Sequence, residues 1–144
     1  MKYMEFALSE AKKAFMDNEV PVGCVIVKDN NVIASAHNTT ISDMNDTHHA
    51  EINAINEAIA RIGDKNLMGC DMYVTLEPCP MCAGAIINTK IKRIYIGADE
   101  PKSGCFGSAI DFNIIGFNHK PEIYHGICEE ECKTLMKDYF KCKR

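Results

Sequence analysis

Apolar residues recur at every third or fourth position in three segments of the chain, the spacing that places side chains on one face of a helix. The first segment is residues 4–15, the second is marked by Ile52, Ile55, Ile59 and Ile62 and stops at Gly63, and the third is residues 129–140. Glycine is a typical residue at the end of a helix, and Asp46 or Thr47 are suitable caps at the start of the second one. The pattern therefore predicts three amphipathic helices.

Short runs rich in β-branched residues predict strands between these helices. The predicted strands are residues 22–27, 32–36, 72–76, 93–97 and 122–125. The first two form a β-hairpin around the turn residues 29–31. Pro80 suits the first turn of a fourth helix, which we expect to run to about Asn88. Strands that alternate with helices indicate an α/β sandwich around one mixed sheet.

The length and composition of the chain are typical of one folded domain. It has 144 residues, of which 47% are hydrophobic and 25% charged, so we expect a single domain over residues 1–144. No apolar stretch is long enough to span a bilayer, and the start of the chain lacks the apolar run of a signal peptide, which predicts a cytoplasmic protein without a membrane partner. The net charge of −4 gives no whole-chain electrostatic argument for a nucleic-acid partner.

The chain has eight cysteines, and a reducing compartment makes metal binding, catalysis or burial more plausible for them than disulfides. Cys79 and Cys82 lie three residues apart at a predicted helix start, so they project to the same side and can bind one ion. His49 begins the neighbouring predicted helix and can supply a third ligand. A tetrahedral zinc ion with three protein ligands keeps one position for water.

Glu51 lies two residues beyond His49, about 200° around an ideal helix, so we do not expect it to bind the same ion. A carboxylate beside the metal can take a proton from water and pass protons to a ring nitrogen and a departing amine. The predicted reaction is hydrolytic release of ammonia from an amidine-like carbon.

A lone Cys-x-x-Cys pair is equally compatible with a structural metal site or with two ordinary helix cysteines, and His-x-Glu alone means little. The two motifs together, each at the start of a predicted helix, favour a catalytic zinc ion, one per subunit.

His-x-Glu followed by Pro-Cys-x-x-Cys is the signature of zinc nucleobase deaminases. Beyond it, the chain resembles the bacterial tRNA-specific adenosine deaminases over nearly its full length, in the segments Glu19-Val-Pro-Val-Gly23, Ala36-His-Asn38, His49-Ala-Glu51, 73–84, Gly97-Ala98, Lys102-Ser-Gly104 and Asn118-His119. The resemblance implies a cytidine deaminase-like fold, a three-layer α/β/α sandwich around a mixed five-stranded sheet. It also implies a homodimer that binds a tRNA anticodon stem-loop and converts the wobble adenosine to inosine.

The resemblance further implies roles for residues that would contact the reacting base. Asn38 would hold the flipped nucleotide, and Val22 and Ala50 would line the base pocket. The backbone carbonyl of Glu77 would accept a hydrogen bond from the leaving amine.

Other residues would contact the RNA beyond the reacting base. Flanking nucleotides would meet Glu100, Lys102 and Ser103. The anticodon loop would be supported by Tyr139 and Phe140.

His48 departs from the family, which usually has a small residue there, and Glu100 replaces a shorter acid. We interpret His48 as a surface residue at the helix start, with a substitute ligand or a substrate contact as the alternatives. Cys24, Cys128 and Cys132 are interpreted as small buried side chains.

Two other functions are open at this point. A guanine, cytosine or nucleoside deaminase would use the same zinc chemistry without a nucleic-acid surface. A non-catalytic scaffold subunit would keep zinc as a structural ion, but such a protein has no need of Glu51.

Overall fold

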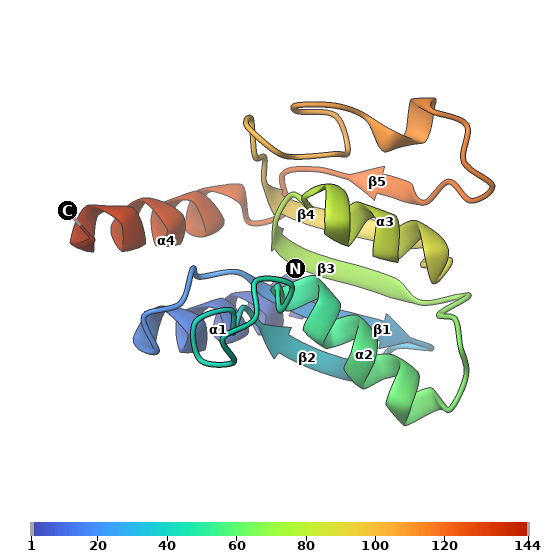
Figure 1. The fold of residues 1–144 in the computed structure, drawn as a ribbon, viewed down its shortest axis with the longest axis horizontal. Helices are drawn as coiled ribbons and strands as arrows, with labels where there is room; N and C mark the ends of the chain where they lie inside the picture. The colour runs from blue at the N-terminus through green and yellow to red at the C-terminus, as the bar shows by residue number, and fades with distance from the viewer. Residues whose placement is uncertain (1, 144) are drawn as a thin grey trace.

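The computed structural model describes residues 2–143 and shows a mixed five-stranded sheet between two layers of helices (Figure 1). Helices α1 (Lys2–Met16) and α4 (Glu129–Cys142) pack on one face of the sheet, and α2 (Ala50–Ile62) and α3 (Pro80–Asn88) pack on the other. The predicted three-layer α/β/α sandwich is therefore confirmed. Among residues 2–143, no helix is both long and apolar enough to cross a membrane.

The strands lie in the order β2-β1-β3-β4-β5. Their bounds are Gly23–Lys28 for β1, Asn31–His37 for β2, Asp71–Leu76 for β3, Arg93–Ala98 for β4 and Glu122–Tyr124 for β5. Strand β1 is antiparallel to both β2 and β3, while β3, β4 and β5 are mutually parallel. Every strand except β1 therefore runs in the same direction, as the arrows in Figure 1 show.

This direction fixes where the helices begin. Helix α2 follows β2 and helix α3 follows β3, so both start from the edge of the sheet at which these parallel strands end. The two helices also contact each other on the same face of the sheet. The topology therefore brings the residues just before α2 close to those just before α3.

Alternation of side chains along the strands builds a separate core on each face of the sheet. In β3, Met72 and Val74 point into the larger core under α2 and α3, and Tyr73 points into the smaller core under α1. The Tyr73 ring stacks on Tyr95 at 4.4 Å between ring centroids, and Tyr95 stacks on Tyr124 at 5.0 Å. Three neighbouring strands are thus joined by one row of aromatic rings.

Two details differ from the sequence-based expectations. The N-cap of α2 is His49, with no side-chain capping bond, so Asp46 and Thr47 as caps were wrong. The loop before α2 folds on itself instead: the Thr47 amide and hydroxyl both donate to Asn45. A short 3-10 helix, Phe112–Ile114, was not predicted, because one turn is too short to show periodicity.

Close packing of α1 on β1 depends on the absence of a side chain at Gly23. A Cβ at this position would overlap the Ala7 carbonyl oxygen and lie 2.5 Å from the Ala11 amide nitrogen, both of which are backbone atoms of α1. We expect Gly23→Ala to lower the free energy of unfolding by about 3 kcal/mol, since the helix must move off the sheet. Urea denaturation measures the change.

Gly84→Ala is the matched control, because a Cβ at Gly84 has no neighbour within 4 Å. In this helical position alanine is expected to be neutral or to stabilise by up to about 1 kcal/mol. Equal effects of the two substitutions would contradict the proposed packing.

Candidate active site and metal centre

A cavity of about 330 Å³ opens at the edge of the sheet where α2 and α3 begin. Its size is that of a small-molecule site, roughly 300 to 1,000 Å³. It is lined by Val20, Val22, Asn38, Thr40, Asp46, His49, Ala50, Glu51, Leu76, Glu77, Cys79, Glu100 and Ser103. The lining therefore comes from four segments far apart in the sequence.

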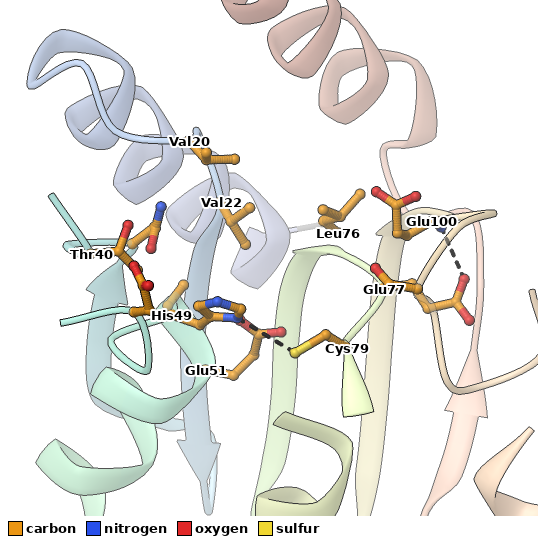
Figure 2. Close-up of a pocket in the computed structure, with 13 residues that line it drawn as sticks. Val20, Val22, Thr40, His49, Glu51, Leu76, Glu77, Cys79 and Glu100 are labelled. Carbon is orange, nitrogen blue, oxygen red and sulfur yellow. Dashed lines mark hydrogen bonds between the residues drawn. The ribbon is translucent and has the colours of Figure 1, made fainter. Parts of the chain in front are cut away.

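One imidazole and two thiols converge at this cavity. His49 and Cys79 are the N-cap residues of α2 and α3, and Cys82 lies one turn into α3. The Nδ1 atom of His49 is 3.5 Å from the Cys79 sulfur and 3.6 Å from the Cys82 sulfur. Figure 2 shows His49 and Cys79 facing each other, with Glu51 beside His49.

These distances fit a zinc ion. Zn–N bonds of about 2.0 Å and Zn–S bonds of about 2.3 Å at a tetrahedral angle place nitrogen and sulfur about 3.5 Å apart. The three ligand atoms all lie within 4.8 Å of one another. The nitrogen and sulfur donors also suit zinc better than magnesium or calcium, which prefer oxygen.

The interaction between the two cysteines shifts their pKa values in opposite directions. A hydrogen bond from Cys82 lowers the pKa of Cys79 to about 4 despite burial, with a further contribution from His49, and the same pairing raises the pKa of Cys82. The N-terminus of α3 also favours a thiolate at the Cys79 position. Metal binding displaces a thiol proton, because thiolates are the binding form.

Glu51 is buried, with 4% of its surface exposed, and it lines the cavity without belonging to the ligand cluster. Burial raises the pKa of Glu51 to about 7, and the nearby Cys79 thiolate adds to the rise. A carboxyl group with a pKa near neutral can both accept and donate a proton at physiological pH.

Asn38 supplies an unused acceptor to the cavity. It follows β2, is 5% exposed, and its Oδ1 atom has no hydrogen-bond partner among the described residues. A buried acceptor without a partner costs free energy, so its position is explained best if a bound molecule donates to it.

The loop of residues 99–108 forms one side of the cavity and is held by the carboxylate of Glu77. This carboxylate accepts hydrogen bonds from the amides of Glu100 at 3.1 Å, Phe106 at 3.0 Å and Ser108 at 3.1 Å, and from the Ser108 hydroxyl. Figure 2 shows the bond from Glu100. Gly104 allows the close approach, because a Cβ there would lie 2.6 Å from the Glu100 carbonyl oxygen.

A second buried carboxylate, that of Glu19, holds the loop on the opposite side of the cavity. It accepts hydrogen bonds from the Ile41 amide at 3.0 Å and from the Ser42 amide and hydroxyl, each at 2.7 Å. Burial alone would raise the pKa of Glu19, but these hydrogen bonds outweigh it and lower the pKa below its ordinary value. The neighbouring residue Thr40 lines the cavity.

Comparison with known proteins identifies the family. Residues 1–98 match the cytidine and deoxycytidylate deaminase zinc-binding region, and this part contains all three candidate ligands. A tRNA-specific adenosine deaminase of Rickettsia felis is 49% identical over 145 residues, covering 96% of this chain and 98% of that protein. The chain belongs to the tRNA-specific adenosine deaminase family. As a member of this family it is a hydrolytic deaminase with zinc as its cofactor.

Other deaminases are also similar to this chain in sequence or in structure. The tRNA-specific adenosine deaminase of Bacillus subtilis is 42% identical and covers 96% of this chain and 87% of that protein. A solved structure of a tRNA deaminase that edits adenosine to inosine at the wobble position matches with a TM-score of 0.87 at 41% identity, covering 93% of this chain and 98% of that one. Guanine deaminase of Bacillus subtilis matches with a TM-score of 0.65 at 27% identity, covering 81% and 85%.

The structure of this deaminase brings most of the predicted substrate residues together at the cavity, but not all. Asn38, Val22, Ala50, Glu77, Glu100 and Ser103 line it, whereas Lys102, Tyr139 and Phe140 are not among the lining residues. Tyr139 is buried, and its hydroxyl donates to the Asn18 carbonyl at 3.2 Å. Substrate contacts by the three residues outside the cavity stay predictions.

His48 is not part of the ligand cluster. One ring nitrogen lies 2.8 Å from the Asp43 carboxylate and the other lies 3.1 Å from the Asn45 side chain. Its role is thus to tie down the loop before α2, within which Asp43 also accepts from Thr39.

Four lining residues were not predicted: Val20, Thr40, Asp46 and Leu76. Val20 and Leu76 lie within the segments 19–23 and 73–84 that carry the family resemblance, and their nearness to Val22 and Glu77 was the available signal. Thr40 and Asp46 lie in an irregular polar loop, where sequence pattern gives no information on which side chains turn inward.

The Glu19 hydrogen bonds predict a pH-dependent contribution to stability. Because its pKa is lower in the folded protein than in the unfolded chain, the contribution is complete above the unfolded value of about 4.3 and is lost as the pH falls through the folded value. We expect Glu19→Gln to lower the free energy of unfolding by about 1–3 kcal/mol at pH 7, with a smaller deficit at pH 3. Denaturation curves of both proteins over this range measure it, and a deficit independent of pH would refute the assignment.

Proposed function

We propose that this protein deaminates the wobble adenosine of a tRNA anticodon to inosine. The observation that carries the reaction class is the placement of His49, Cys79 and Cys82 around a zinc-sized position with buried Glu51 beside it in an open cavity. The substrate is inferred from the tRNA-specific relatives, which match this chain at higher identity and over more of its length than the guanine deaminase does.

In the proposed mechanism, His49, Cys79 and Cys82 hold one zinc ion. Zinc in such a site lowers the pKa of a bound water molecule so that hydroxide is available near neutral pH. The two thiolates balance the charge of the ion, and their place at the start of α3 provides backbone N–H groups that moderate the negative charge on sulfur.

Glu51 is the proposed acid and base. Its carboxylate takes a proton from the attacking water and passes it to N1 of the adenine ring as the C6–O bond forms. The remaining proton of the attacking oxygen then moves through Glu51 to the exocyclic amine, the C6–N bond breaks, and ammonia leaves. One water is consumed, and Glu51 ends in its starting state.

The reacting base is proposed to enter the cavity between Val22 and Ala50, with Asn38 as an acceptor for the nucleotide and the Glu77 carbonyl as an acceptor for the leaving amine. A base in an anticodon loop is already partly unstacked, so turning it into a pocket costs less than extraction from a duplex. Nucleotides beside it are proposed to contact the loop that carries Glu100, Lys102 and Ser103.

The protein is proposed to act in the cytoplasm as a homodimer of single-domain chains. The segment after β4 supports association, because it exposes several large apolar side chains, namely Ile110, Ile114, Ile115 and Phe117. Large apolar side chains exposed close together in one segment are consistent with a contact to another protein. Sedimentation that gave only a monomer at micromolar concentration would exclude this assembly.

The substrate assignment is tested by ammonia release. We expect turnover of an anticodon stem-loop with adenosine at the wobble position and none of the same stem-loop with guanosine there. Guanine, cytosine and cytidine are the competing substrates. Turnover of these small molecules alone would overturn the tRNA assignment and favour the alternative deaminases.

The role of Glu51 is tested by Glu51→Gln, which keeps the side-chain volume but cannot accept a proton. We expect turnover of the stem-loop to fall by about 10²- to 10⁴-fold, with zinc content still one ion per chain. Metal analysis and thermal denaturation serve as controls for site and fold. Full turnover in the variant would show that Glu51 is not the acid and base and would end the proposed mechanism.

A further inference from the structure

His125 lies at the same edge of the sheet as the candidate active site, although it is remote from the site in sequence. It follows β5, and β5 is parallel to β3 and β4, so its position corresponds to that of the residues after those strands. Neither the sequence analysis nor the proposed mechanism assigns it a role. Its ring, however, contacts the loop of residues 99–108 at two points.

The two contacts join both ends of that loop. The Nδ1 atom of His125 is 2.8 Å from the carboxylate of Asp99, which begins the loop, and the Nε2 atom is 3.0 Å from the carbonyl oxygen of Phe106, near its end. A carboxylate and a carbonyl oxygen both accept hydrogen bonds. Each ring nitrogen must therefore donate, and only the imidazolium form of His125 can make both bonds.

The contacts of His125 with the loop complement those of the Glu77 carboxylate. The amide of Phe106 donates to the Glu77 carboxylate while its carbonyl oxygen accepts from His125, so both backbone polar groups of this residue are held. Glu77 fixes the loop from inside the protein, and His125 closes it from outside. Between these anchors lie Glu100 and Ser103, which line the cavity.

We propose that His125 is a positioning residue for substrate, which as an imidazolium holds the 99–108 loop in the conformation that contacts nucleotides beside the reacting base. This inference rests on the proposed function, because it assigns the loop to RNA recognition. The Glu77, Asp99 and His125 groups also have the spacing of a cation site. The carboxylate of Glu77 already accepts four hydrogen bonds and both nitrogens of His125 are engaged, which assigns the cluster to loop positioning instead.

The first test compares His125→Gln, which cannot bridge both acceptors as a cation, with His125→Arg, which keeps the charge and several donors. We expect His125→Gln to raise KM for the anticodon stem-loop about fivefold, as for one exposed ion pair, with kcat within about twofold and one zinc ion per chain. His125→Arg should recover most of the affinity. Tyr124→Phe is the matched control, since its hydroxyl donates to Glu122 outside the loop.

A second measurement, hydrogen exchange, tests whether His125 orders the loop independently of the substrate assignment. Hydrogen exchange of the amides of Glu100, Phe106 and Ser108 should be faster in His125→Gln than in the wild type or Tyr124→Phe. If the wild type deaminates no stem-loop, the proposed function fails, while the exchange rates still decide whether His125 orders the loop. Unchanged KM and unchanged exchange, or a loss of zinc in His125→Gln, would overturn the inference.

Discussion

The site depends on the direction of a single strand. Because β1 is antiparallel to both β2 and β3, the two strands that flank it end at the same edge of the sheet, and the helices that follow them begin there side by side. His49 and Cys79 occupy equivalent N-cap positions on the two helices. A histidine and a cysteine separated by thirty residues are thereby brought within 3.5 Å, although the loop of residues 38–49 that leads into α2 must also be ordered.

Two buried carboxylates solve a problem that this topology creates. The loops on either side of the cavity are irregular, so their amides have no strand or helix to pair with, and buried amides without partners are costly. Glu19 accepts from one loop and Glu77 from the other. Each carboxylate is nearly inaccessible to solvent, and each charge is offset by three or more donated hydrogen bonds. Charge-assisted hydrogen bonds to these two carboxylates therefore hold the loops on both sides of the cavity.

Most of the fold was predictable because its determinants are local. Pro80 and Gly63 mark helix boundaries through backbone conformation, and the β-branched runs mark strands. The ligand residues were predictable because Cys79 and Cys82 are close in sequence and His49 has its own motif. The functions of Glu19 and of the Glu77 carboxylate were not predictable, since their hydrogen-bond partners lie more than twenty residues away in the sequence. The residue type alone does not distinguish a buried glutamate from an exposed one. The predicted cap of α2 was wrong for a similar reason: Thr47 donates a hydrogen bond to Asn45 within the preceding loop and does not cap the helix.

Because the 99–108 loop is anchored by residues outside its tip, the tip and the metal centre can change independently during evolution. The Glu77 carboxylate and the chemistry at Cys79 belong to one short stretch of chain, whereas the tip of the loop at Pro101, Lys102 and Ser103 is solvent-exposed and makes no side-chain hydrogen bond to that carboxylate. Substitutions at the tip can therefore accumulate without disturbing the metal centre. A scaffold built in this way can diversify which nucleotide neighbours it tolerates while its hydrolytic machinery stays the same.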